Sequence, residues 1–250
     1  IVMTHRAAWV DFRCSQNVQL IKLVRDIVKS VEENTAFSVY SGYASDYTKE
    51  RYGVDWSLVA PFVSTAFAGY NAKDEHIVAT RKSLGNTPFI GGEMYLETMS
   101  YSEPYPPPAS DWANRLLRNV VTGGGQGVII WWLPVLDGEA WHGTARVVDI
   151  VSEWERFFLK GRLREGLVEI NGDVDERQVH VMDLGCERLV LIYNRTTEWQ
   201  ISTIKHKGVS SSWRGRHVGE KLVRDAMKST KVVSAPYDTT ILHVYNNARR

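Results

Sequence analysis

The feature that most constrains the fold is a regular alternation of apolar strands with amphipathic helices through the first 160 residues. In the opening helix, Val18, Ile21 and Val24 recur at helical spacing between charged residues. The predicted strands span 36–43, 61–71, 87–95 and 126–134, and the predicted helices span 16–33, part of 46–60, 73–84, 111–121 and 140–158. Such an alternation predicts a parallel sheet, in either a barrel or a doubly wound fold.

The pattern changes after about residue 160 to short alternating segments separated by turn signals such as Asn171-Gly172. The predicted strands here are 177–184, 188–195, 199–206, 231–236 and 239–246. They predict a small antiparallel β-sandwich. We therefore expect two domains, 1–160 and 161–250.

Composition excludes several classes of function. Thirty basic residues face 29 acidic ones, without a basic cluster that would favour nucleic acid as a partner. No apolar run reaches the length of a membrane span. The two cysteines, Cys14 and Cys186, show no metal-ligand spacing, so we predict neither a metal nor a cofactor. The residues give no indication of the cellular compartment.

Glu93 is the strongest candidate for chemistry. It lies at the end of an otherwise apolar strand, and functional residues of parallel α/β sheets gather at the carboxyl ends of strands. An ionised carboxylate is costly there unless it is used or paired. Strand alternation places Phe89, Gly91 and Glu93 on one side, and Gly91 could leave room for a ligand. Other acids at strand ends or in the following loops are Asp46, Glu97, Asp137 and Glu139.

Aromatic residues are unusually frequent, with nine Trp and eleven Tyr, and several fall at predicted strand ends. Flat apolar rings with a polar tip suit the faces of sugars. Trp131 and Trp132 are adjacent, so they point to opposite sides of the strand and only one can face a ligand. The predicted substrate-binding residues are Tyr43, Tyr70, Asn71, Tyr95, Trp131, Trp132 and Glu139.

The segments TPFIGGEMYLE and QGVIIWWLP, with the YGVDW-to-VSTAFAGYN block before them, resemble strands six to eight of the clan A glycoside hydrolases. The last third of the chain resembles the accessory domains of their β-galactosidase-like members. The resemblance implies the C-terminal half of a (β/α)₈ TIM barrel followed by a β-sandwich. It also implies that Glu93 is the nucleophile at the end of strand seven and that Trp131 or Trp132 is a sugar platform.

In that clan the acid/base is a Glu at the end of strand four, and strand four would lie before Ile1. The resemblance thus implies a retaining hydrolase of O-glycosyl bonds whose acid/base comes from an N-terminal half barrel, in the same or a separate chain. The chain alone would be catalytically incomplete. An alternative is a non-catalytic carbohydrate-binding or scaffold protein with a degenerate glycosidase barrel.

A third hypothesis takes the four strand-helix units as a complete doubly wound domain. It is the weakest, because no glycine-rich phosphate loop follows any predicted strand: Gly123, Gly124 and Gly125 precede one. No Ser or Cys nucleophile motif accompanies the scattered histidines.

Overall fold

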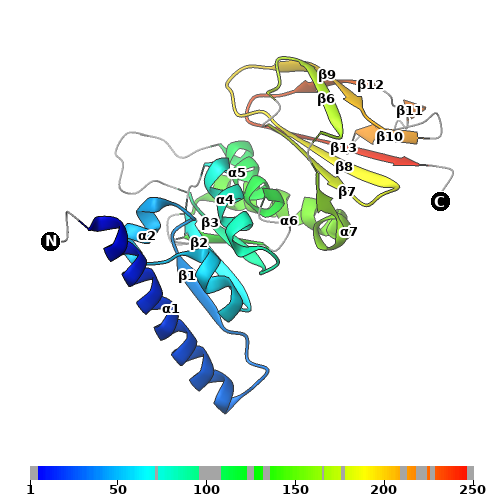
Figure 1. Cartoon of the computed structure of the whole chain (residues 1–250). Coiled ribbons are helices and arrows are strands. Elements are labelled where there is room, and N and C mark those ends of the chain that lie inside the picture. The colour runs from blue at the N-terminus through cyan, green and yellow to red at the C-terminus, as the bar shows by residue number, and fades with distance from the viewer. Residues whose placement is uncertain are drawn as a thin grey trace. The chain divides into compact units, whose positions relative to one another are not determined.

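The computed structural model describes residues 5–70, 73–95, 108–122, 127–131, 136–164, 166–175, 178–208, 213–217, 224–225 and 229–246. The chain divides into two compact units. One contains residues 1–94 and 122–133, and the other contains residues 95–121 and 134–250. Figure 1 shows the elements of both units along the chain.

The first unit is built on a four-stranded parallel sheet in the order β1-β2-β3-β4. Its strands are β1 (Ser38–Ser41), β2 (Thr65–Tyr70), β3 (Phe89–Met94) and β4 (Val128–Trp131). Spatial order follows chain order without a reversal. A doubly wound sheet reverses its order at a switch point, whereas a barrel adds strands in sequence, so the described sheet has the order of a barrel segment.

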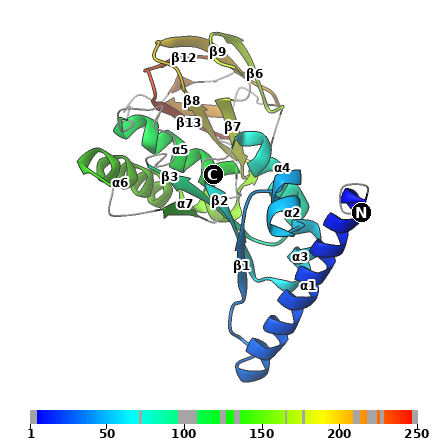
Figure 2. The same ribbon diagram turned by 90° about the vertical axis from the view of Figure 1, so that its left-hand side faces the viewer.

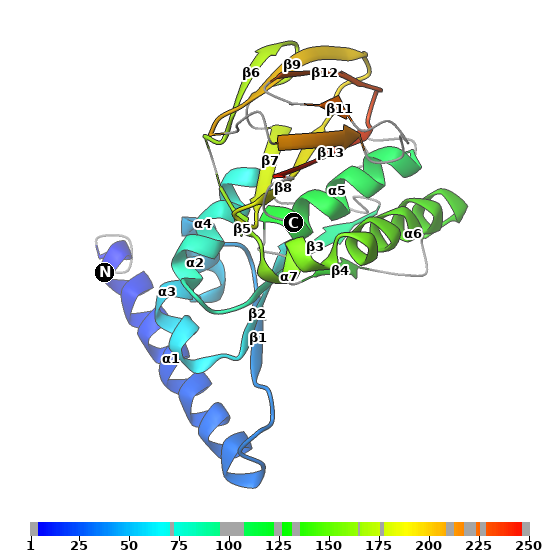
Figure 3. The same cartoon turned by 90° about the vertical axis from the view of Figure 1, so that its right-hand side faces the viewer.

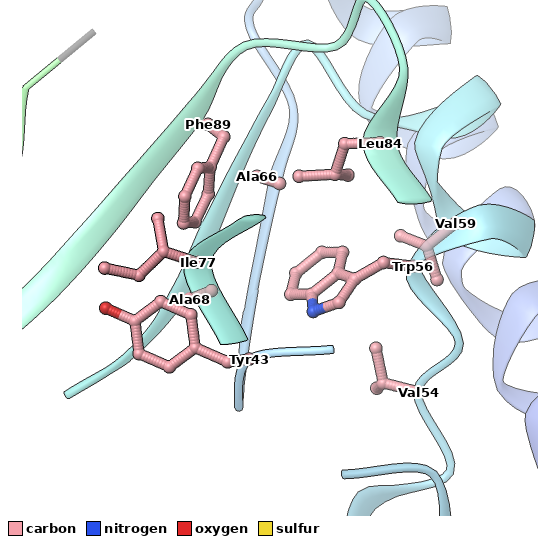
Figure 4. Close-up of a cluster of buried hydrophobic side chains, with 9 residues drawn as sticks. All are labelled: Tyr43, Val54, Trp56, Val59, Ala66, Ala68, Ile77, Leu84 and Phe89. Atoms are coloured by element: carbon pink, nitrogen blue, oxygen red, sulfur yellow. The ribbon is translucent and has the colours of Figure 1, made fainter. Parts of the chain in front are cut away.

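The helices of this unit are α1 (Arg6–Val31), α2 (Asp46–Tyr52), α3 (Trp56–Val59), the 3₁₀ turn η1 (Ala60–Phe62) and α4 (Asp74–Leu84). All of them except α2 contribute side chains to one hydrophobic cluster with the strands. Figure 4 shows the cluster they form: Trp56 of α3 and Ile77 of α4 lie among Ala66, Ala68 and Phe89 of the strands. Figure 2 shows α1 and α3 alongside β1.

Local polar contacts fix the turn between β1 and β2. Ser45 begins α2 as its N-cap, and its Oγ accepts a hydrogen bond from the Thr48 N–H at 3.1 Å. Gly53 ends that helix in the left-handed region, with φ of 65°. Trp56 then donates its indole N–H to the carbonyl of Gly42 at 2.8 Å, which holds α3 against the end of β1.

The second unit contains the remaining helices and two antiparallel sheets. Its helices are α5 (Ala109–Thr122), whose last residue falls in the first unit, α6 (Gly138–Glu153) and α7 (Glu155–Lys160). One sheet has the order β11-β10-β13-β8-β7-β5 and the other the order β12-β9-β6. Their strands are β5 (Arg162–Leu163), β6 (Val168–Gly172), β7 (Val179–Asp183), β8 (Glu187–Tyr193), β9 (Gln200–His206), β10 (Trp213–His217), β11 (Arg224–Asp225), β12 (Ser229–Ser234) and β13 (Thr239–Asn246).

The two antiparallel sheets share one hydrophobic cluster. Val190 and Leu242 belong to the larger sheet, and Ile204 and Val232 belong to the smaller one. Figure 3 shows β6, β9 and β12 as one layer beside β7, β8 and β13. The predicted change from a parallel α/β segment to antiparallel strands is therefore observed, while the domain boundary near residue 161 and the sandwich assignment stay predictions.

Candidate functional site

A pocket of about 770 Å³ lies in the first unit at the carboxyl ends of β1, β2 and β3. Its walls carry five tyrosines, Tyr40, Tyr43, Tyr47, Tyr52 and Tyr70. Ser41, Ser45, Thr48 and His76 add smaller polar groups. Among the described residues that line this pocket, none is Asp, Glu, Lys or Arg. It is therefore an aromatic and hydroxyl-rich site at the end of a parallel sheet where α/β folds bind their ligands.

Tyr70, one of the predicted substrate-binding residues, lines this pocket. Its ring is 5.9 Å from the ring of Tyr40 on β1 and 5.3 Å from that of Trp131 on β4. Gly92 makes this position available, because a Cβ there would stand 2.5 Å from a carbon of the Tyr70 ring and 2.2 Å from the Gly69 carbonyl oxygen. Only glycine at position 92 permits so close an approach.

Tyr40 is a site residue that sequence reasoning did not identify. Burial, and then its hydrogen bond with Tyr70, raise the pKa of the Tyr40 phenol well above its usual value. Tyr40 stands next to Ser41 at the end of a strand, and this position could have indicated a site residue. The face of the sheet on which Tyr40 lies, however, depends on the packing of Val39 against the helices, which the sequence does not show.

Tyr43 lines the pocket, but its hydroxyl is engaged in the fold. The hydroxyl donates to the Gly92 carbonyl at 3.1 Å and accepts from the Gly92 N–H at 3.2 Å. The ring contacts Phe89 edge-on at 6.1 Å (Figure 4). Tyr43 thus fixes the end of β3 beside the pocket.

Glu93 is fully buried, with 0% of its surface exposed. Strand alternation and the pairing of Gly91 with Ala68 place it on the same face as Phe89. That face packs against the helices, whereas Tyr70 lies over Gly92 on the opposite face. Glu93 is not among the residues that line the pocket.

Tyr95 and Glu139 belong to the second unit. The hydroxyl of the buried Tyr95 donates to Asp137 Oδ1 at 2.7 Å. Burial is the larger cause, and this hydrogen bond the second, of a raised pKa of the Tyr95 phenol. Asp137 caps α6, because its carboxylate accepts a hydrogen bond from the Ala140 N–H at 2.9 Å. This bond is the larger cause, and the bond from the Tyr95 hydroxyl the second, of a lowered pKa of the Asp137 carboxyl. Glu139 is exposed and accepts from the Ala109 N–H at 3.2 Å. These bonds stabilise helix starts in the second unit.

Trp131 ends β4 with 49% of its surface exposed, on the face of Met94, with which it pairs. Asn71, Trp132 and Glu97 lie outside the described residues. Asp46 lies in the first turn of α2. The structure thus brings Tyr43 and Tyr70 together in the pocket, with Trp131 against Tyr70.

Among the described residues, no group of His, Cys, Asp and Glu has the arrangement of a metal site. Within the same ranges, every helix is too short or too polar to cross a bilayer.

No protein-family model matches the sequence, and no curated protein is similar to it in sequence. Solved structures do match its fold. A GH30 endoxylanase from Clostridium papyrosolvens matches with a TM-score of 0.52 at 11% identity, over 93% of this chain and 60% of that chain. An Anoxybacillus α-amylase matches with a TM-score of 0.60 at 11% identity, over 91% of this chain and 56% of that chain.

A glycoside hydrolase family 5 protein from Bacteroides vulgatus gives a TM-score of 0.53 at 12% identity, over 94% of this chain and 67% of that one. Identities this low establish the fold alone. The chain spans 60%, 47% and 58% of the first three matched structures. It therefore shares its fold with part of the TIM-barrel glycoside hydrolases, which confirms the predicted resemblance at the level of fold.

Proposed function

We propose that this chain is the C-terminal part of a glycoside hydrolase that cleaves O-glycosyl bonds with retention and binds its sugar at the carboxyl ends of β1 to β4. The observation that carries the proposal is the tyrosine-lined pocket at the ends of a parallel sheet with barrel strand order. The matched glycoside hydrolases share that fold. Aromatic faces bind the apolar faces of sugar rings, and phenol and serine hydroxyls can pair with sugar hydroxyls.

The proposal includes an N-terminal half barrel as a partner. Among the described strands, β1 pairs only with β2 and β4 pairs only with β3, so each has one edge available for a further strand. α1 supports this partner as well. Its Val18 and Ile21 pack on the core, yet Leu20, Leu23 and Ile27 are exposed. A helix with apolar residues on two sides is typical of an interior position in a ring of helices.

In this proposal Glu93 is the nucleophile, and the acid/base comes from a segment before residue 1. The retaining mechanism requires two carboxylates about 5 to 5.5 Å apart. Glu93 is buried on the face of the sheet that packs against the helices. To act as the nucleophile, its carboxylate must reach the opposite face, where the pocket lies, in the complete protein.

The test compares Glu93→Gln with Glu153→Gln in the natural full-length protein. Glu153 is an exposed glutamate on α6 and serves as the matched control. Loss of a covalent nucleophile should lower hydrolysis more than about 1,000-fold, while thermal unfolding stays close to that of the wild type. Glu153→Gln should hydrolyse normally.

A mechanism-based fluorinated glycoside provides a second readout. It should attach covalently to Glu93, and peptide mass spectrometry locates the label. Near-normal hydrolysis by Glu93→Gln would sink the assignment of Glu93. Sugar binding without hydrolysis or labelling would instead identify a non-catalytic carbohydrate-binding protein.

A further inference from the structure

Two side chains of α1 hold the C-terminal end of α2, which lies beside the first half of α1 (Figure 1). Arg13 donates to the carbonyl oxygens of residues 50 and 51, at 2.6 and 3.3 Å. Asn17, one helical turn later, donates through its amide to the carbonyl oxygens of residues 52 and 53, at 2.7 and 2.9 Å. The last carbonyls of a helix have no partner within the helix. Consecutive carbonyls at this end of α2 therefore receive their donors from α1.

The close approach of the two helices depends on Gly53, where α2 ends with φ of 65°. A Cβ at this position would stand 2.7 Å from the amide nitrogen of Asn17. Any larger residue would thus displace the Asn17 amide and adopt an unfavourable backbone conformation. An exposed ion pair between Arg6 and Glu50 also joins the helices, but such pairs add little stability. The bonds to backbone carbonyls are therefore the specific part of the contact.

The position of α2 is not set by the apolar core. Among the described residues, the hydrophobic cluster of the first unit includes none from α2, and only Thr48 of this helix is buried. A helix of seven residues is also too short to be stable without tertiary contacts. At its N-terminal end the Thr48 hydroxyl donates to the Tyr43 carbonyl at 2.6 Å. At its C-terminal end the polar bonds to the core helices come from Arg13 and Asn17.

The wall of the pocket depends on this helix. Tyr47 and Tyr52 of α2 both line the pocket, and their rings meet edge-on at 6.1 Å. Tyr52 belongs to both contacts, because its carbonyl accepts from Asn17 while its ring faces the pocket. A shift of the last turn of α2 would therefore move the tyrosine wall. Arg13 and Asn17 themselves do not line the pocket, so any effect they have on it passes through α2.

We infer that Arg13 and Asn17 are positioning residues of the pocket, which hold α2 and its two tyrosines in the geometry that binds the ligand. The inference rests on the proposed function, because it concerns the same site. Glu93, the proposed nucleophile, lies on β3 and not on α2. Loss of the contact should therefore weaken binding of the substrate more than it slows the chemical step.

The experiment uses the natural full-length protein with two test variants and one control. Asn17→Leu removes the amide donors at similar side-chain size, and Arg13→Met removes the guanidinium but keeps an unbranched stem. Arg25→Met is the matched control, because Arg25 lies on the same helix and pairs with its exposed neighbour Asp26. Without any ligand, hydrogen exchange in peptides of α2 should become about tenfold faster in the two test variants. Exchange in β2 and β3 should not change, and the control should match the wild type.

Kinetics then measure the effect on the site, with the best-hydrolysed member of a panel of p-nitrophenyl mono- and disaccharides. Each test variant should raise KM about 5- to 20-fold and leave kcat within about threefold of the wild type. Arg13→Lys keeps a cationic donor and should restore KM to within about threefold. A merely structural role would lower thermal stability and the active fraction without moving KM.

Unchanged exchange in α2 in both test variants would overturn the inference. Faster exchange with an unchanged KM would overturn it as well and leave the hydrolase proposal standing. If the wild type hydrolyses no glycoside, the hydrolase proposal fails, and calorimetry with the strongest ligand from a glycan array decides the inference. About tenfold weaker binding by the test variants would then support it. Equal affinity, or no glycan ligand at all, would reject it.

Discussion

His206 on β9 is a buried base, and neither of its two ring nitrogens has a hydrogen-bond partner among the described residues. Only 6% of its surface is exposed. Burial, and then the positive charge of Arg188, lower its pKa from 6.5 to about 4. The folded protein therefore holds this imidazole neutral where the unfolded chain would already bind a proton.

The pH dependence follows from that difference. Below pH 6.5 the unfolded chain binds more protons at this site than the folded chain, so stability falls as the pH falls toward 4. We expect this residue to remove about 3 kcal/mol of unfolding free energy between pH 7 and pH 4. Urea unfolding at pH 7, 5.5 and 4 measures the effect.

His206→Leu is the control, because it keeps a side chain of similar size without a titrating group. The variant should lose that component of the pH dependence and be at least as stable as the wild type at pH 7. Equal pH slopes for the two proteins would show that His206 does not titrate on unfolding.

At the scale of residues, the sequence predicted Glu93 and Tyr70 as site residues, and it could not predict the faces of the sheet on which they lie. Alternation correctly groups Phe89, Gly91 and Glu93, yet it cannot say which group of residues faces the helices. In the structure Phe89 packs against α4, so the group of Phe89 is the one that faces the helices. The glycine that leaves room for an aromatic ring is Gly92, not Gly91. Such facts depend on contacts between distant segments.

Among the elements, α2 carries two of the pocket tyrosines, Tyr47 and Tyr52. Its N-cap, Ser45, accepts from the Thr48 N–H. Ser45→Ala should destabilise the protein by about 1 kcal/mol, because that N–H loses its side-chain acceptor. Urea unfolding checks the value.

Ser45→Asn is the matched control, because asparagine caps helices about as well as serine. It should stay within about 0.5 kcal/mol of the wild type. An equal loss in both variants would mean that the serine acts through packing, and no loss in either would mean that the cap contributes little.

The sequence predicted the four parallel strands within a few residues, because each is a short apolar run between turn signals. It could not predict which unit the later helices join. Asn114 of α5 donates to the carbonyls of Asn194 and Tyr237 at 3.1 and 2.7 Å. Arg156 of α7 pairs with the buried Glu187 of β8, which also bonds His243 at 2.9 Å. These contacts join residues 31 to 123 positions apart, beyond the reach of local periodicity.

For the whole molecule, strand order decides between the two α/β folds that the sequence allowed. The order β1-β2-β3-β4 lacks the reversal of a doubly wound sheet, and the matched solved structures are glycoside hydrolases with TIM barrels. The apolar side of α1 and the available edges of β1 and β4 support the proposed N-terminal half barrel.

The central claim is that a sugar chain binds at the carboxyl ends of β1 to β4. Hydrogen exchange with and without a saturating oligosaccharide substrate, followed by mass spectrometry, tests it most directly. The account predicts that protection rises in α2 and at the ends of β1 and β2, where the pocket lies. Protection confined to the antiparallel strands β6, β9 and β12 would contradict it.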